Sequence, residues 1–374
     1  MKIALISFHN ALNYGAALQA FSLQHSLELH GFTSEYINYI NSTRHGFYSS
    51  LVQFKLAWKA GNKKRAIMLL IGAPILMLRK RAFDKFYRKY LKVTPQIYST
   101  SEECKKLNDN YEKFIAGSDQ IWNPVNNGND TAYMLDFVRE PHRKISYASS
   151  FGIDKIPNDL NSAYKHALEN IGYLSTREQA GVNLISQITG KKASLVIDPV
   201  FLTPIEDWEK LITPISQAKS FIFLYTNQRS QHKQFISRFG NKFSSIHLLS
   251  THLGLEEILN RKIHLRTAMS PCNFLAEIKN ASLVVTASFH CLAFAILLQK
   301  PFMVLLSGKA GKDERLLNLL RLTGLSHRIL TDKTTYQEIM SPIDYSKVQE
   351  ILQAEIARSE QFLYQALTET HNEN

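Results

Sequence analysis

The sequence predicts an α/β protein with largely parallel sheets and two domains. Strand and helix patterns alternate from the amino terminus onward, and the same alternation starts again after residue 199. The 374 residues are also too many for one ordinary hydrophobic core. We expect the crossover at Pro199–Pro204, which gives domains at 1–198 and 199–345, followed by a terminal segment at 346–374.

The first half opens with a strand–helix–strand pattern. Residues 2–8 are strand-like, apolar positions at helical spacing predict a helix over 16–30 closed by Gly31, and 33–40 read as the next strand. A basic helical insertion follows over about 44–92. Further strands are expected at 111–117, 144–150, 172–176 and 195–197. Such alternation favours a parallel sheet.

The second half repeats the alternation. Strands are expected at 220–225, 245–249, 283–286 and 301–306. Helices are expected at 231–239, 271–280, 291–298 and 313–325, and a long amphipathic helix at 346–367. This order predicts a second α/β domain.

Charge is concentrated in one segment. Lys and Arg total 44 against 32 Asp and Glu, a net charge of +12, and residues 55–92 hold 12 basic residues and one acid. No nucleic-acid recognition motif accompanies this charge, so we expect no nucleic-acid partner. Three cysteines without metal-like spacing predict neither a disulfide framework nor a zinc site, and the amino terminus lacks a signal-peptide pattern. We expect a cytoplasmic protein.

The basic segment also contains an apolar stretch. Ile67–Leu78 is interrupted by Gly72 and Pro74 and flanked by basic triplets at 63–65 and 79–81. It is shorter than the ~20 residues that a membrane span needs. Two interpretations stay open: a packed helical hairpin with a solvated basic face, or peripheral contact with the cytoplasmic face of the membrane.

The strand 283–286 and the helix after it carry the first candidate site. Ser288 is a suitable N-cap, and His290 lies in the first helical turn. The amino end of a helix attracts anions, and open α/β sheets bind ligands at the carboxyl ends of their strands. The pattern therefore places an acid/base group beside an anion site, whereas a purely structural histidine is the alternative.

A polar loop follows the strand at 111–117. In it Ser118, Asp119, Gln120 and Asn123 offer hydrogen bonds to sugar hydroxyls, and Trp122 offers a flat apolar face for stacking. A structural turn around a buried tryptophan is the alternative. The loop predicts a saccharide-binding site.

Other anion-binding groups also follow predicted strands. Arg177 comes after the strand at 172–176, and Lys309, Lys312 and Arg315 come after the one at 301–306, where a solvated basic loop is the alternative. Asn13 and Gly15 open the first helix, without the G-x-G-x-x-G pattern of dinucleotide sites. No metal-ligand spacing or nucleophile elbow is present. The set fits group transfer involving a small, highly charged phosphate compound.

Seven motifs, in order from residue 13 to residue 320, resemble the polysaccharide pyruvyl transferase family. They are Asn13-Tyr-Gly-Ala-Ala-Leu-Gln-Ala20, Gly117-Ser-Asp-Gln-Ile-Trp-Asn123, Tyr147-Ala-Ser-Ser-Phe-Gly152, Ser175-Thr-Arg-Glu178, Val196-Ile-Asp-Pro-Val-Phe-Leu202, Ser288-Phe-His290 and Asp313-Glu-Arg-Leu-Leu-Asn-Leu-Leu320. The resemblance implies two Rossmann-like domains facing a cleft, as in GT-B glycosyltransferases, with a terminal helix crossing back to the first domain.

The resemblance also implies phosphoenolpyruvate as donor and a sugar diol, on a glycan or lipid-linked precursor, as acceptor. On that basis His290 is the expected general acid and Asp119 the expected base for the sugar hydroxyl. Arg177 and Arg315 are expected to bind the donor's carboxylate and phosphate. No cofactor beyond the co-substrate is expected. The product would be a pyruvate ketal for cell-surface or exopolysaccharide synthesis.

One position departs from the family. Many relatives have arginine two residues before the histidine, where this chain has Ser288, and Lys309 or Lys312 can supply the cation instead. Two other functions stay open on the same fold: a GT-B-type glycosyltransferase with a nucleotide-sugar donor, and a non-catalytic glycan-binding member.

Overall fold

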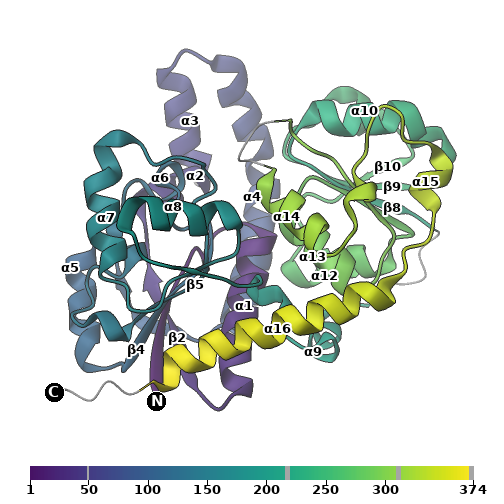
Figure 1. Ribbon diagram of the computed structural model, residues 1–374. Helices are drawn as coiled ribbons and strands as arrows, with labels where there is room; N and C mark the ends of the chain where they lie inside the picture. Colours follow the sequence, from purple (N-terminus) through teal and green to yellow (C-terminus); the bar gives the residue numbers. More distant parts are fainter. Residues whose placement is uncertain (49, 215–219, 309–312, 370–374) are drawn as a thin grey trace. The chain divides into compact units, whose positions relative to one another are not determined.

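The computed structural model describes residues 1–48, 50–214, 220–308 and 313–369 (Figure 1). Its internal contacts define two units. Unit 1 comprises Met1–Lys80, Asp84–Thr203 and Ala354–Asn374, and unit 2 comprises Arg81–Phe83 and Pro204–Gln353. Each unit is built around one parallel sheet.

The sheet of unit 1 has the strand order β3-β2-β1-β4-β5-β6-β7, with parallel pairing throughout. The order reverses between β1 and β4, which makes this the topological switch point where ligands of open α/β sheets bind. The strands are β1 Lys2–Ile6, β2 Thr33–Tyr39, β3 Val93–Tyr98, β4 Lys113–Asp119, β5 Lys144–Ser149, β6 Ser175–Thr176 and β7 Ser194–Leu195.

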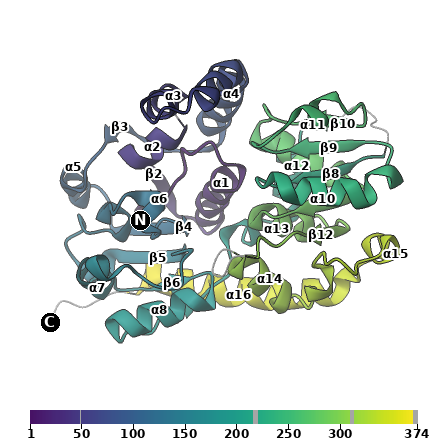
Figure 2. The ribbon, with the colours of Figure 1, turned by 90° about the horizontal axis from the view of Figure 1, so that it is seen from above.

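Helices cover both faces of this sheet, with α1 on one side and α5 and α7 on the other (Figure 2). Parallel strands covered in this way are apolar along their whole length, as the buried residues Ile3–Ile6 of β1 illustrate. The helices of unit 1 are α1 Tyr14–Leu29, α2 Ser42–Tyr48, α3 Ser50–Lys59, α4 Lys63–Tyr90, α5 Ser101–Cys104, α6 Pro124–Asn127, α7 Asn161–Glu169 and α8 Gln179–Thr189. The expected basic insertion is confirmed and consists of α2, α3 and α4.

The sheet of unit 2 has the order β10-β9-β8-β11-β12, again parallel, and its switch point lies between β8 and β11. Its strands are β8 Ile222–Tyr225, β9 Ile246–Leu249, β10 Ile263–Leu265, β11 Leu283–Thr286 and β12 Phe302–Val304. Its helices are α9 Ile205–Leu211, α10 Arg229–Phe239, α11 Leu255–Leu259, α12 Pro271–Asn280, α13 Phe289–Leu297, α14 Glu314–Leu322 and α15 Tyr336–Met340. Together the two units confirm the predicted pair of Rossmann-like domains.

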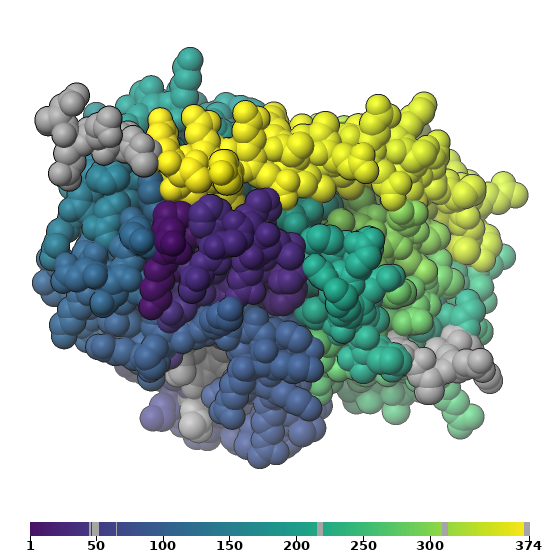
Figure 3. All heavy atoms as spheres, turned by 90° about the horizontal axis from the view of Figure 1, so that it is seen from below, coloured from purple at the N-terminus to yellow at the C-terminus, as the bar shows by residue number. Residues whose placement is uncertain are grey.

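The terminal helix α16, Tyr345–Thr368, contributes residues to both units. Its later turns pack on unit 1, where the Ser359 hydroxyl accepts a hydrogen bond from the Ile197 amide (2.9 Å) and Leu363 and Leu367 are buried. Figure 3 shows these turns, in yellow, against the amino-terminal segment in purple. The predicted crossover helix is therefore present.

Candidate functional site

In unit 1, Arg177 is the centre of a buried ionic network. Its guanidinium donates to Asp198 at 2.6 Å and to Asp119 at 3.2 Å, and Glu178 lies 3.7 Å away. The Arg177 side chain is 1% exposed. Burial alone would lower the pKa of Arg177, but the three carboxylates outweigh it and raise the pKa. The predicted donor-binding arginine thus directs its guanidinium at the protein's own carboxylates.

Asp119 ends β4 at the switch point of the sheet. It is the most exposed of the three carboxylates, with 13% of its side chain accessible, and its backbone has a positive φ of 83°. The preceding Gly117 is required by close packing, because a Cβ there would lie 1.9 Å from the Tyr147 carbonyl oxygen. Asp119, two residues after this close contact, is the last residue of β4 and pairs with Ser149 of β5.

Ser118 is fully buried and joins β4 to its neighbours. Its carbonyl accepts a bond from the Ser7 hydroxyl at 2.9 Å, its amide donates to Gln19 at 3.1 Å, and its hydroxyl lies 3.3 Å from Asp198. Gln19 also donates to the Ser7 hydroxyl, so β1, α1 and β4 share one polar network. Ser118 is therefore part of the support for Asp119 and has no surface available to an acceptor.

Three other predicted acceptor contacts also stabilise the loop after β4. Trp122 is fully buried, and its indole N–H donates to the Tyr133 carbonyl at 2.9 Å. Asn123 is the N-cap of α6, and the Gln120 side chain accepts a bond from Asn126 at 3.3 Å. The expected stacking face on Trp122 is absent from this geometry, because the ring lies in the core. Gln120 is the partly exposed member of the three.

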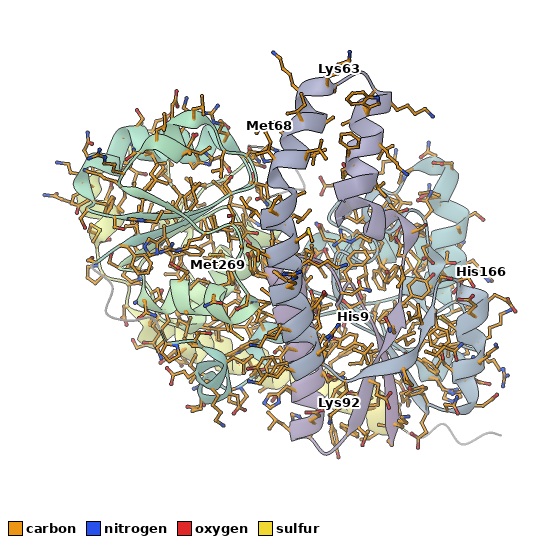
Figure 4. The ribbon with its side chains drawn as sticks, turned by 180° about the vertical axis from the view of Figure 1, so that it is seen from behind. His9, Lys63, Met68, Lys92, His166 and Met269 are labelled. Carbon is orange, nitrogen blue, oxygen red and sulfur yellow. The ribbon has the colours of Figure 1, made fainter. Side chains whose placement is uncertain are left out.

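Asn13 and Gly15 lie at the start of α1, which follows β1, one of the two strands that border this switch point. The Asn13 side chain caps the helix by accepting a bond from the Ala16 amide at 3.1 Å, and Gly15 is buried in the first turn. His9, in the loop after β1 (Figure 4), is buried against Tyr36 and lies 3.2 Å from the Ser7 carbonyl oxygen. Burial lowers the pKa of His9 to about 4, so this imidazole is neutral at pH 7.

In unit 2, His290 lies in the first turn of α13, directly after β11 at the switch point of the second sheet. It is 6% exposed and packs edge-on against Phe289, with ring centroids 5.1 Å apart. Ser288 occupies the N-cap position, but its side chain makes no capping bond, and its amide donates to the Thr286 hydroxyl at 3.0 Å. Ser288 therefore has the predicted N-cap position, and the turn is closed through Thr286 without a bond from the Ser288 side chain.

Arg315 lies beside this turn. It is in the first turn of α14, half-buried, with its guanidinium carbon 5.9 Å from the centroid of the Phe289 ring. The structure thus brings two predicted site residues, His290 and Arg315, to adjacent helices of unit 2. Lys309 and Lys312 lie outside the described residues. The Gly308 amide donates to the Asp313 carboxylate at 2.9 Å.

Sequence reasoning missed the partners of Arg177. Asp198 is fully buried and Glu178 accepts a bond from the Phe151 amide at 3.3 Å. Both residues are part of the motifs quoted above. Glu178 directly follows Arg177 in the sequence, and this adjacent acid was the available sign that the arginine has carboxylate partners. Over the described ranges, no group of three or more His, Cys, Asp or Glu side chains is placed to hold a metal ion.

Comparison with known proteins gives a family match and a fold match. The family model for polysaccharide pyruvyl transferase matches residues 13–308. No curated protein sequence matches the chain. Among solved structures, a UDP-N-acetylglucosamine 2-epimerase described as putative, from Listeria monocytogenes, has 10% identity and a TM-score of 0.56, with 99% of this chain and 97% of that chain covered.

A second solved structure is UDP-GlcNAc 2-epimerase from Neisseria meningitidis bound to UDP-GlcNAc. It has 10% identity and a TM-score of 0.52, and covers 98% of this chain and 99% of that chain. At this identity the likeness concerns the fold alone, which is of the GT-B-like type.

Proposed function

The chain belongs to the polysaccharide pyruvyl transferase family, and we propose that it transfers pyruvate from phosphoenolpyruvate to a sugar diol, forming a cyclic ketal. The acceptor is a saccharide of a polysaccharide or of a lipid-linked glycan precursor, and the reaction takes place in the cytoplasm, where phosphoenolpyruvate is made. The observation that carries the proposal is the family match over 13–308, which includes Asp119, Arg177 and His290.

The chemistry follows from the donor. A proton added to the methylene carbon of phosphoenolpyruvate produces a methyl group and an oxocarbenium-like centre at the adjacent carbon. One sugar hydroxyl adds to this carbon, phosphate leaves with its bridging oxygen, and the neighbouring hydroxyl closes the ketal. Over the whole reaction, the sugar loses two hydroxyl protons, and one proton is gained by the new methyl group and one by the phosphate. This chemistry needs an acid, a base and a cation.

We assign the acid to His290, because imidazole exchanges protons readily and the residue stands at the switch point of its sheet with Arg315 nearby. Arg315 is the cation proposed for the donor's negative charge. Lys309 and Lys312 remain candidates for the same role, and the backbone at Ser288 is the proposed anion contact of α13.

We assign the base to Asp119. Its carboxylate is the partly exposed end of the Arg177 network, and Gln120 beside it is partly exposed as well. Because Arg177 donates to both Asp119 and Asp198, we propose that it positions Asp119 and stabilises its negative charge, in place of binding the donor directly.

Thermal-shift titration tests the donor. Phosphoenolpyruvate at 100 times its dissociation constant should stabilise the protein by about 2.7 kcal/mol, which is a shift of several degrees. The shift should be lost in Arg315→Met, and the unliganded melting temperature of this partly buried position is measured alongside as the control for folding. Stabilisation by UDP- or GDP-sugars alone would instead assign the protein to glycosyl transfer. Acceptor-dependent phosphate release from phosphoenolpyruvate then tests the reaction. If the protein binds the donor or a glycan but releases no phosphate with any glycan tested, it is a non-catalytic member.

A further inference from the structure

The hairpin of α3 and α4 exposes an unusually large apolar surface. Met68 is 62% exposed and Ile71 is 68% exposed, values typical of surface polar residues. We call the following set the hairpin surface: Leu56, Trp58, Ile67, Met68, Leu70, Ile71, Ile75, Met77 and Leu78. Soluble proteins rarely expose so many large apolar side chains together unless they bind something.

Helical spacing places the α4 members on one side of the helix. Residues 66–78 contain no polar side chain, which corresponds to roughly 20 Å of helix at 1.5 Å per residue. At about 100° per residue, Ile67, Met68 and Ile71 fall on the same half of the helix as Ile75 and Leu78. Leu69, Gly72, Ala73 and Leu76, on the other half, are only partly exposed.

The two ends of the hairpin are fixed within unit 1. At the tip the chain reverses at Gly61, which has a φ of 72°, and the Asn62 amide donates to the Ala57 carbonyl at 2.9 Å. Figure 4 shows Lys63 at this tip and Met68 directed outward from α4. At the base Arg79 donates to the Leu12 carbonyl at 2.9 Å and lies over the Tyr14 ring. Arg79 therefore anchors the base of α4 through Leu12 and Tyr14.

Exposed cations border the hairpin surface at both ends. Lys55, Lys59, Lys63 and Lys64 surround the tip. Beyond the apolar stretch, Lys85, Arg88 and Lys89 follow at helical spacing on the same side of α4, and all are exposed. The whole segment 55–92 carries 12 basic residues and one acid. An apolar helix face with basic flanks is the pattern of helices that lie in the interface of an anionic bilayer.

We propose that the hairpin surface docks the protein on an anionic lipid membrane, with α4 lying parallel to the bilayer plane and its basic flanks on the lipid headgroups. Within the described residues, no helix has the length and hydropathy needed to cross a membrane, so the contact is interfacial. The charge favours lipid over a second copy of the chain, because two such basic surfaces repel each other whereas an anionic surface attracts each one. Trp58, 56% exposed and stacked on Phe54, adds an aromatic side chain of the kind that prefers membrane interfaces.

Trp58 supplies a built-in reporter. The chain has three tryptophans, and Trp122 and Trp208 are almost completely buried. The emission of the full-length protein should therefore shift to the blue when phosphatidylcholine vesicles containing phosphatidylglycerol are added, and should not shift with phosphatidylcholine alone. Trp58→Phe should remove the spectral shift while co-sedimentation with the vesicles persists. High salt should weaken binding, because it screens the headgroup charge.

Two double variants separate the apolar and electrostatic contributions. Met68→Glu with Ile71→Glu should weaken vesicle binding at least tenfold, because two charges enter the apolar face. Lys63→Gln with Lys64→Gln should weaken it by roughly 25-fold, at about fivefold per lysine near an anionic surface. The matched controls are Leu255→Glu with Leu259→Glu, which changes two exposed apolar residues of α11, and Lys105→Gln with Lys106→Gln, which removes the same charge elsewhere in unit 1. Both controls should bind like the wild type.

Membrane docking is a property beyond pyruvyl transfer, and the vesicle-binding assay uses no substrate. The docking proposal and the proposed function can therefore fail independently. Absence of binding to anionic vesicles at low salt would overturn the docking proposal, as would equal binding by the Met68→Glu, Ile71→Glu variant with an unchanged melting temperature. A dimer in sedimentation equilibrium that this variant dissociates, without vesicle binding by the wild type, would assign the hairpin surface to a second copy of the chain.

Discussion

Replacement of Arg177 by methionine tests the ionic network most directly. Three carboxylates, of Asp119, Glu178 and Asp198, would lose their common counter-ion in a site where the side chains of Arg177 and Asp198 are at most 1% exposed. Removal of one partner from a buried ion pair costs about 3–5 kcal/mol, because the remaining charge stays buried without compensation. For a domain of this size that corresponds to a fall in melting temperature on the order of 10 °C.

The pH dependence supplies the sharper part of this test. In Arg177→Met the buried carboxylates repel one another, and protonation removes this repulsion. The folded variant therefore binds protons more readily than the unfolded chain does. The loss of stability should therefore be larger at pH 8 than at pH 5. Circular-dichroism melting of wild type and variant across this range measures it.

Arg139→Met is the matched control. Arg139 pairs with Asp109 at 3.2 Å, but the two side chains are 62% and 71% exposed, so its removal should cost less than about 1 kcal/mol. Equal melting temperatures for Arg177→Met and Arg139→Met, or a loss in Arg177→Met that is the same at both pH values, would refute the counter-ion role.

Three further predictions concern the acid, one glycine and one carboxylate. His290→Gln should lower turnover by about 10²–10⁴ with little change in melting temperature, and a variant of normal activity would remove His290 from the mechanism. Gly117→Ala should destabilise the protein far more than Gly190→Ala, because the new Cβ meets a backbone oxygen at 1.9 Å at the first site and nothing within 4 Å at the second; similar melting temperatures would contradict this. Burial alone would raise the pKa of Glu257. Hydrogen bonds from Arg229, His232 and the Gly254 amide outweigh burial and lower this pKa from 4.5 to about 2. Stability should thus be lost as pH falls from about 4.5 toward 2, and Glu257→Gln should flatten the melting profile in that window.

The central strands and well-capped helices were predictable from the sequence. β11 has the expected bounds because a β-branched run surrounded by small residues is buried on both faces. α12 has the expected bounds because Ser270 caps it and Pro271 occupies its first position. The edge strands β3 and β10 were not recognised: β3 pairs on one side only, and three of its six residues are exposed, so its apolar pattern is weak.

The candidate site was predictable in position more than in contacts. Asp119, Arg177 and His290 were located at strand ends because sheet topology requires it. The partners of Arg177 lie 58 and 21 residues away in the sequence, at Asp119 and Asp198, and no local pattern specifies such a pairing. Likewise, a tryptophan in a polar loop has the same sequence pattern whether its ring is exposed or, as for Trp122, in the core.

The shared helix α16 has a consequence for synthesis of the chain. Unit 1 includes the first strand and also Ala354–Asn374, and the buried Ser359, Leu363 and Leu367 complete its core. Because a ribosome delivers the amino terminus first, residues 1–203 must wait for all of unit 2 to be translated before their packing is finished. The part of the protein that is made first is thus completed last, and a nascent chain stopped before residue 354 would expose the surface of unit 1 that α16 normally covers.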